Sequence, residues 1–182
     1  MGGYRHLSSA VVAEAGFLTL VEDTFASPEA EEFVRFVVRH PGAVVAVPVV
    51  DGSALCVRQF RAAVRANMLE LPAGKLDVPG EDPAEAMARE LEEEVGHRPG
   101  RLVELGKFWN SPGFCTELTH VYLALDLEPV ESAEPAKEEE RHMTIEQVPL
   151  VDTARLVAEG TIADAKTIVG LFLAERWLAG QR

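Results

Sequence analysis

The most informative feature of the sequence is the acidic segment at residues 89–96, RELEEEVG. Its four carboxylates come at the C-terminal end of a predicted helix, where the helix dipole already carries about half a negative charge. Glu90, Glu93 and Glu94 are three and four residues apart, so they project from one face of the helix and repel one another. A divalent cation on that face would offset both effects, which makes metal chemistry the first hypothesis.

The residues around this segment predict a capped helix that is preceded by a turn containing glycine. Asp82 is a good N-cap, Pro83 suits the first helical position, and Gly96 suits the C-terminal stop. The preceding turn contains Gly74, which lets the main chain come close to an ion. Arg89 is placed to hold a carboxylate through a two-pronged hydrogen bond. The alternative is an acidic face that is simply solvated.

The charge and composition limit the function further. The chain has 17 basic and 30 acidic residues, for a formal net charge of −13. Such a field disfavours nucleic acid and anionic membrane surfaces as partners. The two cysteines are far apart, and the first residues lack the apolar stretch of a signal peptide. We therefore expect a cytoplasmic protein that is not bound to a membrane.

The order of predicted elements indicates an α+β fold, or an α-β-α sandwich around a mixed sheet. Three strand-like segments come first and predict a small antiparallel sheet, which we assign to a dimerisation domain at residues 1–41. The main domain is expected at residues 42–182. The strands of the N-terminal sheet are predicted at 7–14, 17–25 and 32–40. The strands of the main domain are predicted at 43–50, 54–61, 68–71, 101–109, 118–127 and 143–148. Its helices are predicted at 82–96, 150–159 and 162–178.

The spacing of these residues resembles the Nudix box, a loop-helix-loop motif for metal-assisted hydrolysis of nucleoside diphosphates linked to another group. Gly74, Glu81 and residues 89–96 match it, with one extra residue between the first two. His97 stands where an aliphatic residue is usual. The resemblance implies a Nudix fold and Mg²⁺ as cofactor, with Mn²⁺ or another divalent ion able to substitute. It leaves the role of Glu81 open.

Other segments resemble the ADP-ribose pyrophosphatase branch of that family. Pro112 lies sixteen residues after Gly96, as in the marker of this branch. The resemblance runs from about residue 35 to the C-terminus and implies ADP-ribose as substrate. The segments that carry it, besides residues 111–113, are residues 39–44, 58–63, 69–74 and 164–167.

The resemblance implies a role for each matching residue of the metal site. The Ala73 carbonyl, Glu90 and Glu94 would bind Mg²⁺, Glu93 would bridge metals or water, and Arg89 would orient a carboxylate. The general base would come from the acidic loop at Glu138-Glu139-Glu140. Alignment on the following strand favours Glu139, with its two neighbours as alternatives.

The resemblance also implies the substrate contacts. Arg61 would meet the pyrophosphate, although an arginine on a strand is more often a salt-bridge partner. Glu70 would touch adenine or ribose, Glu117 would accept from a ribose hydroxyl, and Pro112 would line the site. In the expected two-fold homodimer, Arg39 would reach the ligand of the partner subunit.

Two alternatives stay open from the sequence. The first is hydrolysis of another nucleoside diphosphate sugar, because Arg61 and the metals would contact only the diphosphate. The second is a non-catalytic module that senses ADP-ribose; such modules tend to lack box carboxylates, and this chain retains them.

Overall fold

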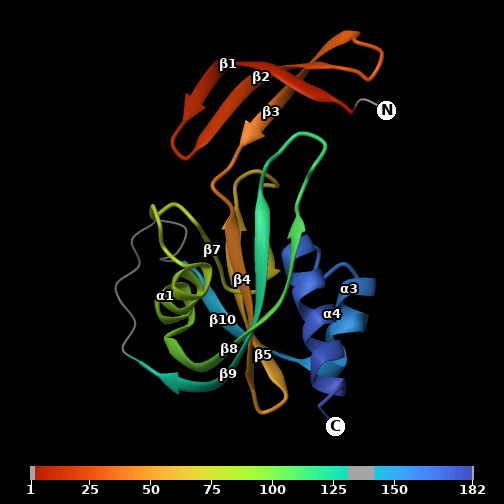
Figure 1. Ribbon diagram of the computed structural model, residues 1–182. Coiled ribbons are helices and arrows are strands. Elements are labelled where there is room, and N and C mark those ends of the chain that lie inside the picture. Colours follow the sequence, from red (N-terminus) through yellow and green to blue (C-terminus); the bar gives the residue numbers. More distant parts are fainter. Residues whose placement is uncertain (1–2, 131–141, 182) are drawn as a thin grey trace. The chain divides into compact units, whose positions relative to one another are not determined.

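The computed structural model describes residues 3–130 and 142–181 (Figure 1). It divides into two compact units. The N-terminal unit comprises Met1–Gly42 and Trp109–Leu118, and the main unit comprises Ala43–Phe108 and Thr119–Arg182. The loop at residues 109–118, which the sequence analysis assigned to the main domain, therefore groups with the N-terminal sheet.

The N-terminal unit is a three-stranded antiparallel sheet in the order β1-β2-β3. The loop at residues 109–118 joins its last strand, because Val38 donates its N–H to the Phe114 carbonyl at 2.7 Å and accepts from Thr116 N at 3.0 Å. Every residue of β1 is exposed. The strands are β1 (Arg5–Ala15), β2 (Leu18–Ala26) and β3 (Glu32–Arg39).

The main unit contains a seven-stranded sheet in the order β10-β5-β4-β9-β8, with β6 beside β5 and β7 beside β4. The central strand β4 runs parallel to β9 and antiparallel to β5, so the mixed sheet predicted from the sequence is confirmed. The strands are β4 (Ala43–Val50), β5 (Ser53–Arg61), β6 (Ala66–Glu70), β7 (Ala73–Lys75), β8 (His97–Trp109), β9 (Leu118–Pro129) and β10 (Thr144–Pro149).

Helices cover both faces of this sheet, which confirms the predicted α-β-α sandwich (Figure 1). Successive residues of β4 point to opposite faces, because side chains alternate along a strand. Val45 packs in the cluster that contains Leu171 of α4, whereas Val44 packs in the cluster that contains Leu91 of α1. The helices are α1 (Pro83–Val95), the 3-10 helix η1 (Leu150–Asp152), α3 (Thr153–Ala158) and α4 (Ala165–Ala179). In the described ranges, no helix has the length and apolar character needed to cross a bilayer.

The structure corrects the predicted boundaries at several places, among them the start of β8, which is His97 rather than residue 101. The last helix begins at Ala165 rather than residue 162, because Asp164 caps it and Ile162 is buried in the preceding segment. The segment at 150–159 begins as a 3-10 turn. Residues 73–75, expected as a turn, form β7 because they pair with β4.

The anchoring of α1 generates the first prediction. Leu91 is 0% exposed in the core between α1 and the sheet. Replacing it by alanine leaves a cavity, so we expect Leu91→Ala to lower the free energy of unfolding by roughly 2–5 kcal/mol, measured by urea denaturation. The control is Val151→Ala, since Val151 is 92% exposed. Equal losses for the two variants would contradict the assigned packing.

Candidate active site

The acidic end of α1 is defined by caps at both ends of the helix. Asp82 accepts a hydrogen bond from Ala84 N at 2.8 Å, and Gly96 adopts a left-handed conformation with φ of 65°. The predicted N-cap and C-terminal stop are therefore confirmed. The last turn of the helix carries Glu92, Glu93 and Glu94, at the end where acids are unfavourable. These caps fix where the carboxylates lie.

Arg89 gathers three of the carboxylates. Its Nε and Nη2 donate to the two oxygens of Glu81 at 3.1 and 3.2 Å, and its Nη1 donates to Glu90 at 2.8 Å and to Glu93 at 3.3 Å. The hydrogen bond to Glu81 and the charge of Glu90 raise the pKa of Arg89 above its usual value, against the effect of burial. The two-pronged hydrogen bond expected for Arg89 is present, and its acceptor is Glu81.

The other side of the helix end lies against β7. Glu94 Oε2 accepts a hydrogen bond from Ala73 N at 3.0 Å. A Cβ atom added to Gly74 would lie 2.1 Å from Glu90 Cδ. Only glycine leaves room for the Glu90 carboxyl group here, and Glu90 itself is 8% exposed. The structure thus brings the Glu94 carboxylate to the Ala73 N–H and the Glu90 carboxyl group to the main chain at Gly74.

This donor set fits a hard divalent cation. Mg²⁺ is usually bound by one or two carboxylates together with water and substrate phosphate oxygens. Glu90 and Glu94 would supply the carboxylates. The cradle at Gly74 keeps Glu90 beside the main chain of β7, and the Ala73 N–H keeps Glu94 there. Within the described residues, His, Cys, Asp and Glu side chains do not by themselves form a metal-binding group of three or more. The Glu93 side chain is 48% exposed, at the rim of the cluster.

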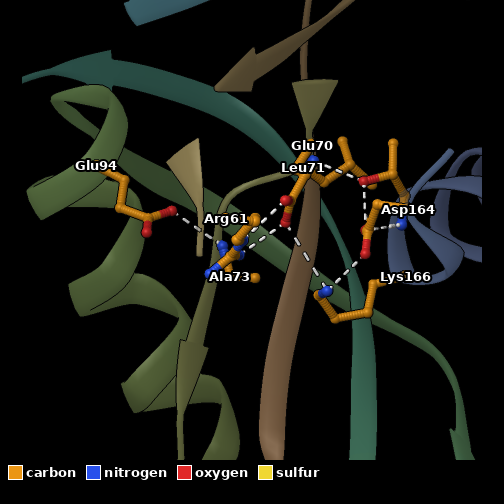
Figure 2. Close-up of polar contacts among 8 residues, drawn as sticks. Arg61, Glu70, Leu71, Ala73, Glu94, Asp164 and Lys166 are labelled. Carbon is orange, nitrogen blue, oxygen red and sulfur yellow. Dashed lines mark hydrogen bonds and ion pairs between the residues drawn. The ribbon is translucent and has the colours of Figure 1, made fainter. Parts of the chain in front are cut away.

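A second ion pair lies next to this cluster, between β5 and β6 (Figure 2). Arg61 donates through Nε and Nη2 to the two oxygens of Glu70 at 2.8 and 2.7 Å. The hydrogen bonds to Glu70 raise the pKa of Arg61, and the charges of Asp164 and Glu94 act in the same direction. The Glu70 side chain is 1% exposed, whereas that of Arg61 is 39% exposed. The arginine therefore lies between a buried partner and the acidic end of α1.

Three residues at the start of α4 extend this pair, and the sequence analysis assigned them no role. Lys166 Nζ lies 2.7 Å from Asp164 Oδ1 and 3.8 Å from Glu70 Oε2 (Figure 2). Asp164 also accepts from the N–H and the hydroxyl of Thr167, both at 2.8 Å. The Thr167 hydroxyl in turn accepts from Leu71 N at 2.9 Å. A polar run that opens an otherwise apolar helix was the signal in the sequence.

The remaining predicted substrate residues belong to the N-terminal unit. Arg39 donates to Asp23 at 2.7 Å, and Asp23, which is 2% exposed, also accepts from Ser9 at 2.6 Å. The ion pair of Asp23 with Arg39 was not predicted from the sequence, because the strand pattern around Asp23 does not reveal its partners. The Glu117 carbonyl accepts from Asn110 N, which closes the loop that contains the exposed Pro112. The predicted bases, Glu138-Glu139-Glu140, lie outside the described residues.

Comparison with known proteins identifies the class. The model of the NUDIX domain family matches residues 39–167, so the chain belongs to this family and is a Nudix hydrolase. It is 39% identical over 141 residues to an ADP-ribose pyrophosphatase of Bacillus subtilis (strain 168), which covers 77% of this chain and 75% of that protein. It is also 37% identical over 169 residues to an ADP-ribose pyrophosphatase of Mycobacterium tuberculosis (strain H37Rv), with coverages of 92% and 81%.

The fold comparison agrees with this assignment. The crystal structure of an ADP compounds hydrolase matches with a TM-score of 0.87 and 26% identity, over 100% of this chain and 97% of the other. The Nudix fold and the resemblance to the ADP-ribose pyrophosphatase branch are therefore confirmed.

The cradle at Gly74 generates the second prediction. In Gly74→Ala the new methyl group would displace the Glu90 carboxyl group. We expect the affinity for Mn²⁺, measured by calorimetry, to fall about 10- to 100-fold, the usual range for losing the support of a metal ligand. The control is Gly3→Ala, because a Cβ atom at Gly3 meets nothing within 4 Å. Unchanged affinity in Gly74→Ala would show that this close approach does not support the metal site.

Proposed function

We propose that the protein is a Mg²⁺-dependent ADP-ribose pyrophosphatase that hydrolyses the diphosphate of ADP-ribose to AMP and ribose 5-phosphate. The observation that carries the proposal is the convergence of Glu90 and Glu94 on β7, next to the partly exposed guanidinium of Arg61. Relatives that are named ADP-ribose pyrophosphatases support the choice of substrate. The protein is further proposed to act in the cytoplasm.

In this mechanism Glu90 and Glu94, with the Ala73 carbonyl, hold the cation. When bound, Mg²⁺ would supply charge that neutralises the diphosphate and would lower the pKa of a coordinated water molecule. Arg61 orients the diphosphate, since a guanidinium pairs well with phosphate oxygens. Arg89 positions Glu81, Glu90 and Glu93 through its hydrogen bonds.

The general base is assigned from the sequence alone. Glu139 accepts the proton of the attacking water in our proposal, with Glu138 and Glu140 as alternatives. Glu93, which pairs with Arg89, would contact a second metal or a bound water. The predicted contact of Glu70 with adenine or ribose stays a prediction. Both of its carboxylate oxygens accept hydrogen bonds from Arg61, which favours a supporting role.

We also propose a two-fold homodimer formed through the N-terminal unit, in which Arg39 of the partner subunit completes the substrate site. The support is the exposed apolar surface of this sheet. Val11 is 62% exposed, Val12 52% and Phe36 56%. Large apolar side chains exposed on a small sheet favour association with another protein surface. Asp23 would keep the guanidinium of Arg39 in place.

The homodimer generates the third prediction. Analytical ultracentrifugation at micromolar concentration should give the mass of two chains. Replacing the exposed Val11 by aspartate should shift the protein to a monomer, because an unpaired charge in an apolar interface is costly. The control is Val151→Asp, since Val151 lies in the main unit and is 92% exposed. A wild-type monomer at this concentration would refute the proposed assembly.

The metal carboxylates generate the fourth prediction. Glu90→Gln and Glu94→Gln should each reduce kcat with Mg²⁺ and ADP-ribose by about 100- to 1,000-fold, because each removes a charge that holds the cation. Both variants should fold normally, since a glutamine at 94 can still accept from Ala73 N. The matched control is Glu92→Gln, on the same helix, because Glu92 pairs with Arg98 instead. Equal activity in all three variants would contradict the assigned roles.

The substrate is tested by offering the purified protein ADP-ribose, ADP-glucose and GDP-mannose with Mg²⁺ and identifying the products by chromatography. Preferential release of AMP and ribose 5-phosphate from ADP-ribose is expected. Faster cleavage of another nucleoside diphosphate sugar would favour the first alternative. Binding of ADP-ribose without hydrolysis of any compound would favour a sensing module.

A further inference from the structure

The start of α4 has a charge in an unfavourable position. Lys166 is the second residue of this helix, where the positive end of the helix dipole disfavours a cation. Its side chain is only 19% exposed. A lysine held in such a place needs acidic partners, and it has two, Asp164 at 2.7 Å and Glu70 at 3.8 Å.

These partners connect α4 to Arg61. The buried Glu70 carboxylate lies between two cations, because it accepts two hydrogen bonds from Arg61 and lies beside Lys166 (Figure 2). Asp164 pairs with Lys166, so basic and acidic side chains alternate in the order Arg61, Glu70, Lys166 and Asp164. Burial opposes the charge of Asp164, yet Lys166 and the hydrogen bonds from Thr167 leave its pKa below the usual value.

The backbone strengthens the same connection. Asp164 caps α4 by accepting from Thr167 N, and the Thr167 hydroxyl accepts from the N–H of Leu71, the residue after Glu70. The position of the helix start is therefore tied to the strand end that carries Glu70. Glu70 in turn orients Arg61, because its two-pronged hydrogen bond turns the Nε and Nη2 edge of the guanidinium inward. The edge with Nη1 faces away from Glu70.

We propose that Lys166 and Asp164 are positioning residues for the diphosphate. They hold the Glu70 carboxylate, and Glu70 holds Arg61 so that its outer edge meets the phosphate oxygens. This inference rests on the proposed function of Arg61. It adds a role for the start of the last helix, which would set substrate affinity without contacting substrate.

The test compares Lys166→Met, Lys166→Arg and the control Lys107→Met. Lys107 also pairs with a glutamate, Glu104 at 3.2 Å, but its side chain is 48% exposed. We expect Lys166→Met to raise KM for ADP-ribose about tenfold while kcat changes less than about threefold, since binding orientation is lost and the cation site is kept. Lys166→Arg should bring KM back toward the wild-type value, and Lys107→Met should leave KM unchanged.

A second readout does not depend on activity. The Nε–H proton of Arg61, which donates to Glu70, should give a distinct nuclear magnetic resonance signal that shifts in Lys166→Met and stays in place in Lys107→Met. An unchanged Arg61 signal, or an unchanged KM in an active Lys166→Met enzyme, overturns the inference. If the wild-type protein cleaves no diphosphate but the Arg61 signal shifts in Lys166→Met, the proposed function fails. The orientation of Arg61 by Lys166 through Glu70 then still stands. Thermal unfolding of each variant verifies that it is folded; Lys166→Gln replaces Lys166→Met if the latter is not.

Discussion

The central constraint on this structure is the concentration of negative charge at the C-terminal end of α1. The carboxylates at the end of α1 repel one another and oppose the helix dipole. Arg89 offsets part of this by bonding to Glu81, Glu90 and Glu93. Negative charge that Arg89 does not neutralise remains on the side of α1 that faces β7. There Glu94 lies against Ala73 and Glu90 against Gly74. An arrangement that is costly for folding alone would become favourable if a cation bound there.

The main unit supplies the rigidity that such a site requires. The central strand β4 is buried from Ala43 to Val47, and it pairs with β7, so the strand beneath the carboxylates cannot move independently. Leu91 anchors α1 to this sheet, because it packs in one buried cluster with Val44 and Ala46 of β4. The start of α4 is held to the strand end at Leu71 by Thr167. Three elements distant in the sequence thus fix one group of polar side chains.

Local signals explain which parts of the fold could be predicted. The caps of α1 depend on residues close in sequence, and both were predicted correctly. The start of α4 was misplaced because the apolar Ile162 was counted with the helix, whereas it is buried in the preceding segment and Asp164 caps the helix. The short strand β7 was read as a turn because its pairing with β4 joins residues far apart in the chain.

The site shows the same division. The acidic residues of α1 could be proposed as metal ligands because they lie on one helix, three and four residues apart. The alternative that Arg61 is a salt-bridge partner is also present in the structure, as its pair with Glu70. The supports from Asp23, Asp164 and Lys166 were not found, since each depends on contacts between separate elements. The sequence therefore indicated the candidate ligands more readily than the ion pairs that hold candidate site residues in place.

The most direct test of this account is the binding of Mn²⁺ itself, followed by electron paramagnetic resonance without substrate. The account predicts that wild-type protein and Glu92→Gln take up the ion alike, whereas Glu94→Gln leaves most of it free in solution. Equal uptake by Glu94→Gln, or loss of uptake in Glu92→Gln alone, would contradict the claim that the face of α1 beside β7 holds the cation.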